Sequence, residues 1–247
     1  MPIALVTGGS RGIGAATGLR LAADGWDIAI SYREAASDAA SVVERCHGLG
    51  RRAVAVRADV SDENDVSDLF AAVDDQLGII GALVNNAGIV GVKARVDETT
   101  RARLERMFAI NVFGAFACAR AAVLRMSTLH GGRGGVIVNV SSAASRLGAP
   151  GEYVDYAASK GAIDSMTVGL AKEVAAEGIR VNAVRPGIIA TDIHGSGGQP
   201  DRADRMRHLI PMLRAGEADE IAGVIAWLCG PDATYVTGSL VDASGGR

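Results

Sequence analysis

The feature that most constrains the fold is a regular alternation of short apolar runs with longer segments of helical pattern. The strand-like runs, rich in β-branched residues, lie at 3–7, 27–32, 53–58, 82–87, 135–142, 179–186 and 238–243. The helical patterns lie at 13–25, 35–49, 62–77, 100–130, 156–177 and 217–229. Strands that are apolar on both faces and separated by helices predict a parallel sheet covered by helices on both sides.

No linker, charge block or repeat divides the 247 residues, so we expect a single α/β domain over 1–247, of the doubly wound Rossmann type. One segment breaks the alternation. Residues 192–216 are rich in Gly, Pro and charge and precede the last helix. Such an insertion is typical of a flap over a substrate site, although an ordinary surface loop is the alternative.

Charge and cysteine content exclude several classes of partner. The 25 basic and 28 acidic residues give a net charge of −3, which provides no basic surface for nucleic acid or for a membrane. No uninterrupted apolar run approaches about 18 residues, so we expect no membrane-spanning segment. The three scattered cysteines indicate buried thiols in a reducing compartment rather than disulfides. We therefore expect a cytoplasmic protein.

A glycine-rich turn follows the first predicted strand. Gly8 permits a tight turn, and Gly12 and Gly14 would let a diphosphate approach the backbone where the first helix begins. Free N–H groups and the positive end of the helix dipole favour an anion there. The turn therefore predicts a dinucleotide site, with a tight turn that holds no ligand as the alternative.

A second pattern, YAASK at 156–160, pairs a tyrosine with a lysine one helical turn later. A free phenol has a pKa of about 10, and a nearby ammonium group favours the phenolate and lowers that value. Tyr156 could then exchange a proton with a carbonyl or an alcohol. Tyr153 has Ala157 four residues on, so it is expected to pack or to lie beside substrate.

These motifs occur in the order and at the distances found in short-chain dehydrogenases/reductases, which the chain resembles over its whole length. The resemblance rests on T-G-x-x-x-G-x-G (7–14), ADV (58–60), NNAG (85–88), Asn111, NVSS (139–142), YAASK (156–160) and RPG (185–187). It implies a seven-stranded parallel sheet of order 3-2-1-4-5-6-7. It also implies a homotetramer in which the long helices carrying Asn111 and Tyr156 form one interface.

The preferred cofactor follows from charge. Proteins of this fold that prefer NAD place an acidic residue at the end of the second strand. Here the strand ends Tyr32-Arg33, with Glu34 as the first carboxylate, and Arg11 lies in the glycine turn. Guanidinium groups suit a phosphate, so NADP(H) is expected over NAD(H).

By resemblance, nineteen residues contact this cofactor. In the family, Lys160 also binds the nicotinamide ribose, and Asp59 and Val60 contact the adenine. The full set is Gly8, Ser10, Arg11, Gly12, Ile13, Gly14, Tyr32, Arg33, Asp59, Val60, Asn86, Ala87, Gly88, Tyr156, Lys160, Pro186, Gly187, Ile189 and Thr191.

The catalytic set implied by the resemblance is Asn111, Ser142, Tyr156 and Lys160. The family serine commonly lies thirteen residues before the tyrosine, a position that Ala143 occupies here. Alignment of NVSS makes Ser142 the match and leaves one inserted residue in the loop 149–155, with Ser141 as the rival. Asn111 would order a water molecule that links the lysine to solvent. No histidine has a partner at metal-ligand spacing, so no catalytic metal is expected.

Together these features predict an NADP(H)-dependent oxidoreductase that interconverts a carbonyl and a secondary alcohol. The motifs resemble those of 3-oxoacyl-carrier-protein reductases and of glucose-dehydrogenase-like members about equally, so a sugar, a small ketone and a 3-oxoacyl thioester all remain open. Glu177 lies where carrier-protein reductases tend to have a basic residue, which weakens the interpretation of the chain as such a reductase. The alternative is an inactive NADP(H)-binding sensor or scaffold, a class that usually lacks the tyrosine or the lysine.

Overall fold

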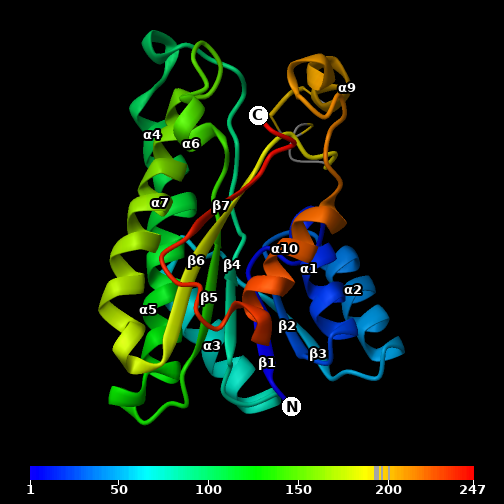
Figure 1. Ribbon diagram of the computed structural model, residues 1–247, viewed down its shortest axis with the longest axis vertical. Helices are drawn as coiled ribbons and strands as arrows, with labels where there is room; N and C mark the ends of the chain where they lie inside the picture. The colour runs from blue at the N-terminus through cyan, green and yellow to red at the C-terminus, as the bar shows by residue number, and fades with distance from the viewer. Residues whose placement is uncertain (192–194, 196, 200) are drawn as a thin grey trace.

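The computed structural model describes residues 1–191, 195, 197–199 and 201–247. Seven parallel strands form one sheet in the order β3-β2-β1-β4-β5-β6-β7, as predicted (Figure 1). The strands are β1 (Ile3–Val6), β2 (Asp27–Tyr32), β3 (Ala53–Arg57), β4 (Ala82–Asn85), β5 (Gly135–Val140), β6 (Ile179–Pro186) and β7 (Leu240–Ala243).

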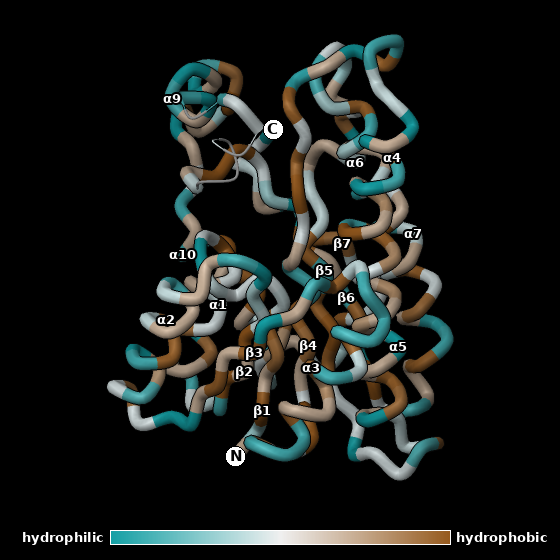
Figure 2. Tube along the Cα trace, turned by 180° about the vertical axis from the view of Figure 1, so that it is seen from behind, coloured by the Kyte–Doolittle hydropathy of each residue, from teal (hydrophilic) through white to brown (hydrophobic). Residues whose placement is uncertain are grey.

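Helices cover both faces of the sheet (Figure 1). On one face pack α1 (Gly12–Ala23), α2 (Ala36–Gly48) and α10 (Ala218–Cys229), and on the other pack α3 (Glu63–Gln76), α5 (Gly114–Met126) and α7 (Val154–Val174). Successive strand residues enter opposite cores, since Leu83 belongs to the α3–α5–α7 side and Val84 to the α1–α2–α10 side. Figure 2 shows the resulting concentration of hydrophobic residues along the strands.

Helix ends follow local sequence signals. The side chain of Asp62 accepts a hydrogen bond of 2.8 Å from the amide of Asn64 and so caps α3. Glu217 and Glu220 form a capping box at the start of α10. Outside 100–130, the helices lie within two residues of the predicted ranges, except that α7 ends at Val174 and a 3₁₀ turn (Ala175–Glu177) completes the range.

The predicted helix at 100–130 is interrupted. It consists of α4 (Arg101–Phe108), a π-helical turn (Ala109–Phe113), α5 and a short 3₁₀ turn (Thr128–His130). A π-turn inserts one extra residue into the helical repeat and often marks a functional site. Asn111 lies at its centre, buried between the helix and the loop after β4.

The helical run Arg101–Met126 is, by length and composition alone, long and apolar enough to cross a membrane. The sequence expectation concerned uninterrupted apolar runs, and Asn111, Arg120 and Arg125 interrupt this one. Half of its apolar window is buried within the protein, and core helices of this length pass the same test. The run is thus weak support for a membrane span, and the absence of one stays a prediction.

Because the strands are parallel, the loops after β1, β4, β5 and β6 all leave the same edge of the sheet. The order in which strands are added to the sheet reverses between β1 and β4, and open α/β sheets bind ligands at such a switch point. Two shorter helices lie beyond this edge, α6 (Ala144–Leu147) and α9 (Arg202–Met206) (Figure 1). Of the predicted flap 192–216, residues 192–194, 196 and 200 lie outside the described residues.

Candidate active site

Two pockets of about 470 Å³ each open side by side at this edge of the sheet. The glycine-turn pocket lies over β1, β2 and β3 and includes Gly8, Arg33 and Asp59 among its lining residues. The tyrosine pocket lies over β5 and β6 and includes Ser142 and Tyr156. Both are bordered by a shared set of residues, Ile13, Asn86, Gly88, Val90 and Thr191. The two pockets therefore adjoin and suit a ligand that extends from one into the other.

The turn after β1 has the backbone geometry that glycine permits. Gly8 and Gly12 have φ values of +62° and +55°, in the left-handed region. The amide of Asn86 holds the turn by donating to the carbonyl oxygens of Thr7 (2.9 Å) and Gly8 (3.0 Å). No side chain caps α1, so its first N–H groups remain for an anionic ligand. This cradle fits the predicted dinucleotide diphosphate.

Gly14 has a packing role in addition to the one expected. A Cβ atom at this position would lie 2.4 Å from the carbonyl oxygen of Gly8 and 2.5 Å from the side-chain nitrogen of Asn86. Those distances are far below van der Waals contact. Gly14 is therefore required for close packing of α1 against the turn, and its part in the approach of a diphosphate stays a prediction.

The glycine-turn pocket contains three arginines and two carboxylates. Arg33 donates to Glu34 at 3.0 Å and forms a longer ion pair of 3.7 Å with Asp59. Burial raises the pKa of Asp59, but the hydrogen bonds from Ser61 and the charge of Arg33 outweigh it and hold that pKa below its usual value. Arg11 and Arg106 complete the basic side. Arg106 lies in α4 without any motif, so sequence reasoning missed it.

The two residues predicted as a catalytic pair lie at the start of α7. Tyr156 and Lys160 are one helical turn apart on the same face, with the Lys160 ammonium 5.8 Å from the centre of the Tyr156 ring. Lys160 is buried and donates a hydrogen bond of 2.7 Å to the carbonyl oxygen of Val140, the last residue of β5. The strand therefore fixes the position of the lysine.

Burial, rather than the lysine charge, dominates the ionisation of this pair. Burial raises the pKa of Tyr156, and a hydrogen bond with Ser142 lowers it in part. The expectation that Lys160 would lower the pKa of the tyrosine is therefore corrected, because desolvation disfavours the phenolate more strongly. Burial also lowers the pKa of Lys160 to about 8, against the charge of Asp164.

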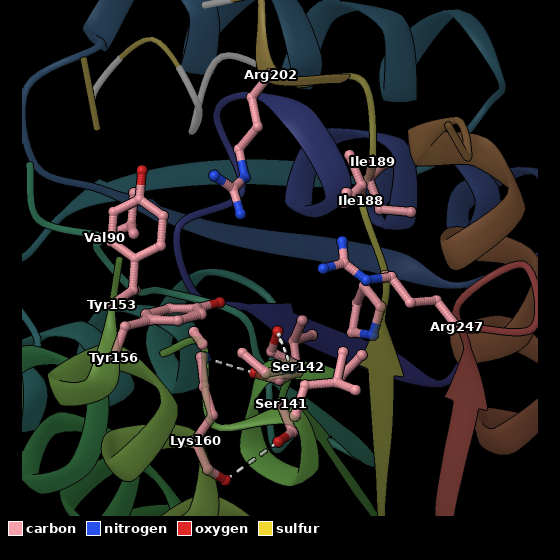
Figure 3. Close-up of a pocket in the computed structure, with 18 of the residues that line it drawn as sticks. Val90, Ser141, Ser142, Tyr153, Tyr156, Lys160, Ile188, Ile189, Arg202 and Arg247 are labelled. Carbon is pink, nitrogen blue, oxygen red and sulfur yellow. Dashed lines mark hydrogen bonds between the residues drawn. The ribbon is translucent and has the colours of Figure 1, made fainter. Parts of the chain in front are cut away.

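The two candidate serines have different surroundings. Ser142 lines the tyrosine pocket beside the Tyr156 hydroxyl, and its own oxygen accepts a hydrogen bond of 3.1 Å from the amide of Ala144 (Figure 3). Ser141 is buried, and its hydroxyl lies 2.7 Å from Asp164 Oδ1. The geometry thus favours Ser142 as the group that holds a reacting oxygen.

Asn111 is held by the protein on both ends of its amide. Its oxygen accepts from the amide of Ile89 at 2.8 Å, and its nitrogen lies 3.0 Å from the Ile89 carbonyl oxygen and 3.1 Å from Ser159 Oγ. A Cβ on Gly88 would lie 3.3 Å from the Asn111 oxygen and 3.6 Å from the Lys160 nitrogen. Asn111 therefore lies next to the lysine, while the predicted ordering of a water molecule stays a prediction.

Asp164 is a buried carboxylate that the sequence reasoning did not select. It lies one turn after Lys160 in α7, and Arg185, at the end of β6, donates two hydrogen bonds of 2.9 and 3.1 Å to it. The i, i+4 spacing from Lys160 was visible in the sequence. The pairing with Arg185 was not, because it depends on the position of α7 over β6.

The far wall of the tyrosine pocket joins the loop 149–153 to α9. Arg202 forms an ion pair of 2.6 Å with Glu152 and lies 5.1 Å above the ring of Tyr153. Tyr153 is buried, and its hydroxyl accepts a hydrogen bond from Gln199. Tyr153 is therefore a packing residue of the pocket wall, one of the two roles expected for it.

Most of the predicted cofactor residues border one of the two pockets. Gly14 and the predicted catalytic Asn111 line neither. Those at the glycine-turn pocket are Gly8, Ser10, Arg11, Gly12, Ile13, Tyr32, Arg33, Asp59, Val60, Asn86, Ala87, Gly88 and Thr191. Those at the tyrosine pocket also include Tyr156, Lys160, Pro186, Gly187 and Ile189.

The described histidines and the three cysteines line neither pocket. His47, His130 and His208 are exposed, and His194 lies outside the described residues. All three cysteines are buried free thiols. Within the described part of the chain, no group of three His, Cys, Asp or Glu side chains could hold a metal ion. The expectation of no catalytic metal stays a prediction.

Comparison with known proteins shows matches over the whole chain. A family model described as enoyl-(acyl carrier protein) reductase matches residues 8–247. The uncharacterized oxidoreductase YgfF of Escherichia coli K12 is 54% identical over 247 residues, with 100% of both chains covered. The 3-oxoacyl-[acyl-carrier-protein] reductase of Synechocystis sp. is 38% identical and covers 99% of this chain and 96% of its own. A blue fluorescent protein from a metagenomic library, solved in complex with NADPH, is 39% identical with a TM-score of 0.90, covering 99% and 97% of the two chains.

Proposed function

The chain belongs to the short-chain dehydrogenase/reductase family, and from this we propose that it is an NADP(H)-dependent oxidoreductase that interconverts a carbonyl compound and a secondary alcohol. One observation carries the proposal. Tyr156, Ser142 and Lys160 meet at the wall of a pocket that adjoins the glycine-turn pocket. A proton donor and a hydride site can therefore face the same substrate.

NADP(H) is proposed as the cofactor because the residues of the glycine-turn pocket fit it. The uncapped N-terminus of α1 suits the diphosphate, and Arg11, Arg33 and Arg106 suit a 2′-phosphate. The NADPH complex of the blue fluorescent protein supports this choice. The bound nicotinamide would supply or accept the hydride.

In the proposed reaction, Tyr156 donates its proton to the carbonyl oxygen during reduction. Since burial keeps the pKa of the phenol high, the neutral form that can donate a proton predominates near neutral pH. The Ser142 hydroxyl holds the same oxygen and orients it toward Tyr156. Lys160 has a pKa of about 8, so near neutral pH it is largely protonated and stabilises negative charge that develops on the tyrosine.

The oligomeric state remains part of the proposal. Two phenylalanines of the helical run, Phe113 and Phe116, are 64% and 51% exposed, and Leu124 is also exposed. Apolar side chains of this size on one helix support an interface between copies of the chain. We propose a cytoplasmic homotetramer of single-domain subunits, and the mass of the particle in solution tests the assembly.

The proposed chemistry is tested by measuring NADPH oxidation with a panel of sugars, small ketones and 3-oxoacyl thioesters. Tyr156→Phe should lower kcat at least 100-fold with the best substrate, since general acid catalysis supplies roughly 10²–10⁴-fold. Tyr153→Phe is the matched control and should keep most of the activity, because its hydroxyl contacts Gln199 rather than Ser142. Full activity in Tyr156→Phe would rule out the proposed mechanism.

A further inference from the structure

The tyrosine pocket contains positive charge that the proposed proton transfer does not use. Its lining includes the guanidinium groups of Arg202 and Arg247, which both point into the pocket near Ser142 and Tyr156 (Figure 3). The two arginines come from α9 and from the residues after β7. They differ in whether a carboxylate already neutralises them.

Arg202 is neutralised and belongs to the wall. Only 9% of it is exposed, and its guanidinium lies 2.6 Å from Glu152 and against the ring of Tyr153. A substrate anion would have to compete with Glu152 for this group. Arg202 therefore gives shape to the pocket rather than a free charge.

Arg247 has no such partner. Among the residues that the structure describes, no carboxylate lies within ion-pair distance of its guanidinium. Among the described residues that line the pocket, Glu152 is the one acidic side chain, and it is paired with Arg202. With Lys160 also cationic below about pH 8, these described lining residues include three cations and one side-chain carboxylate.

The main chain holds Arg247 in place. Gly245 and Gly246 have φ values of +65° and +90°, and they turn the chain back toward the pocket. Ser244 Oγ donates to the main-chain oxygen of Arg247 at 2.7 Å, and Arg146 donates to the same atom. A Cβ on Gly245 would lie 2.8 Å from Ile210, so the turn is packed closely against the segment after α9. The position of Arg247 is therefore fixed by a turn that hydrogen bonds and close packing hold in place.

The rest of the lining is largely apolar. Val90, Leu147, Ile188 and Met206 border the space around the two arginines. A sugar, with a hydroxyl on most of its carbons, would leave polar groups without partners against such walls. A short hydrocarbon chain with one anionic end fits both the walls and the unpaired guanidinium.

We propose that the substrate is a short carbonyl compound bearing a carboxylate, and that Arg247 binds this carboxylate while Tyr156 and Ser142 hold the carbonyl oxygen. The inference rests on the proposed function and specifies its substrate class. A guanidinium group binds a carboxylate through two parallel charge-assisted hydrogen bonds, which fixes the orientation of the chain. Arg247 is then a specificity-determining residue.

The test compares oxo acids with their methyl esters, which keep the carbon skeleton and remove the charge. The series is 2-oxobutanoate, 3-oxobutanoate and 4-oxopentanoate, with NADPH oxidation as the measurement. For the wild-type protein, kcat/KM for the best acid should exceed kcat/KM for its methyl ester by roughly 10- to 100-fold. This is the range expected for a hydrogen bond to a charged group. Arg247→Gln should remove this preference by raising KM for the acid and leaving the ester unchanged.

Arg207→Gln is the matched control, because Arg207 is an exposed arginine near α9 that does not line the pocket. It should behave as wild type with both substrates. Equal rates for acids and esters in wild type, or an unchanged preference in Arg247→Gln, would overturn the inference and leave the proposed function intact.

A binding measurement separates the two proposals. If no carbonyl compound is reduced, the proposed function fails. Calorimetry with pentanoate, which has the carboxylate but no carbonyl, then tests Arg247 by itself in the presence of NADP⁺. Binding to wild type and roughly 10-fold weaker binding to Arg247→Gln would support the carboxylate site, and equal or absent binding would contradict it.

Discussion

Asp164 interacts with both Lys160 and Arg185, so its replacement by asparagine changes the surroundings of two largely buried cations. Asparagine keeps an oxygen that can accept from Ser141, which now lies 2.7 Å from Asp164 Oδ1. It also places an N–H₂ group where Arg185 donates its two hydrogen bonds. The substitution therefore removes the charge with little change in volume.

The structure sets the size of the effect on stability. The side chains of Asp164 and Arg185 are 11% and 17% exposed, so the ion pair is largely removed from solvent. Removal of one partner from a buried pair costs about 3–5 kcal/mol. Asp242 lies 3.9 Å from Arg185 and still offsets part of its charge, which favours the lower end. A loss of about 3 kcal/mol corresponds to a fall in Tm of about 6–12 °C for a chain of this length.

The same change alters the pH dependence of activity. The charge of Asp164 raises the pKa of Lys160 against burial, which brings it to about 8. Without that carboxylate the pKa should fall further, and the lysine should lose its proton at lower pH. If the lysine must be charged, the alkaline limb of the kcat/KM profile moves to lower pH in Asp164→Asn.

Thermal unfolding and a pH–rate profile of NADPH oxidation measure the two effects separately. The control is Asp164→Asn combined with Arg185→Gln, which removes both charges and should recover at least half of the lost stability. The alkaline limb should stay shifted in the double variant, since the carboxylate is still missing. A Tm within about 1 °C of wild type in Asp164→Asn, or additive losses in the double variant, would refute this account of the buried pair.

Three further substitutions test other features. Gly14→Ala should lower the free energy of unfolding by about 1–3 kcal/mol and weaken NADP⁺ binding, since its Cβ would lie 2.4 Å from the Gly8 carbonyl oxygen. Gly48→Ala is the control, because a Cβ there meets open space and should change neither quantity. Denaturation measures the stability and calorimetry measures the binding. Arg33→Ala should raise KM for NADPH roughly 10-fold and leave KM for NADH unchanged, and equal effects on both would contradict the proposed phosphate contact. Burial raises the pKa of Cys118 from 9.0 to about 12. The stability that the buried neutral thiol contributes is therefore fully present below about pH 9, and the free energy of unfolding falls by about 1.4 kcal/mol per pH unit above it. Urea denaturation above pH 9 should therefore show that the free energy of unfolding falls less steeply with pH in Cys118→Ala than in wild type. Identical slopes in the two proteins would count against this explanation.

The sequence was sufficient to predict the features that depend on local or periodic patterns of residues. Apolar residues on both faces of each strand predicted the sheet, and the four-residue spacing of Tyr156 and Lys160 predicted their common face. The π-turn at Ala109–Phe113 was missed, because its residues carry no local signal that distinguishes it from a regular helix.

Properties that depend on tertiary packing were missed or misjudged. Arg202 and Arg247 reach the tyrosine pocket from segments far along the chain, so neither has a recognisable spacing from Tyr156. The pKa of Tyr156 was expected to fall because a sequence displays nearby charges but not burial. The preference for Ser142 over Ser141 gains support from geometry, since Ser142 hydrogen-bonds with Tyr156 whereas the Ser141 hydroxyl is bound to Asp164.

The π-turn also relates the interior of the site to the outer surface of the subunit. One extra residue in a helix rotates everything that follows by about 100° relative to what precedes it. A variant lacking one residue of Ala109–Phe113 would therefore rotate α4 by about 100° relative to α5. Met107 of α4 is buried and Phe116 of α5 is exposed, so such a variant could not keep both side chains where they are. The five residues of the π-turn thus couple the interior packing of α4 to the surface available for assembly.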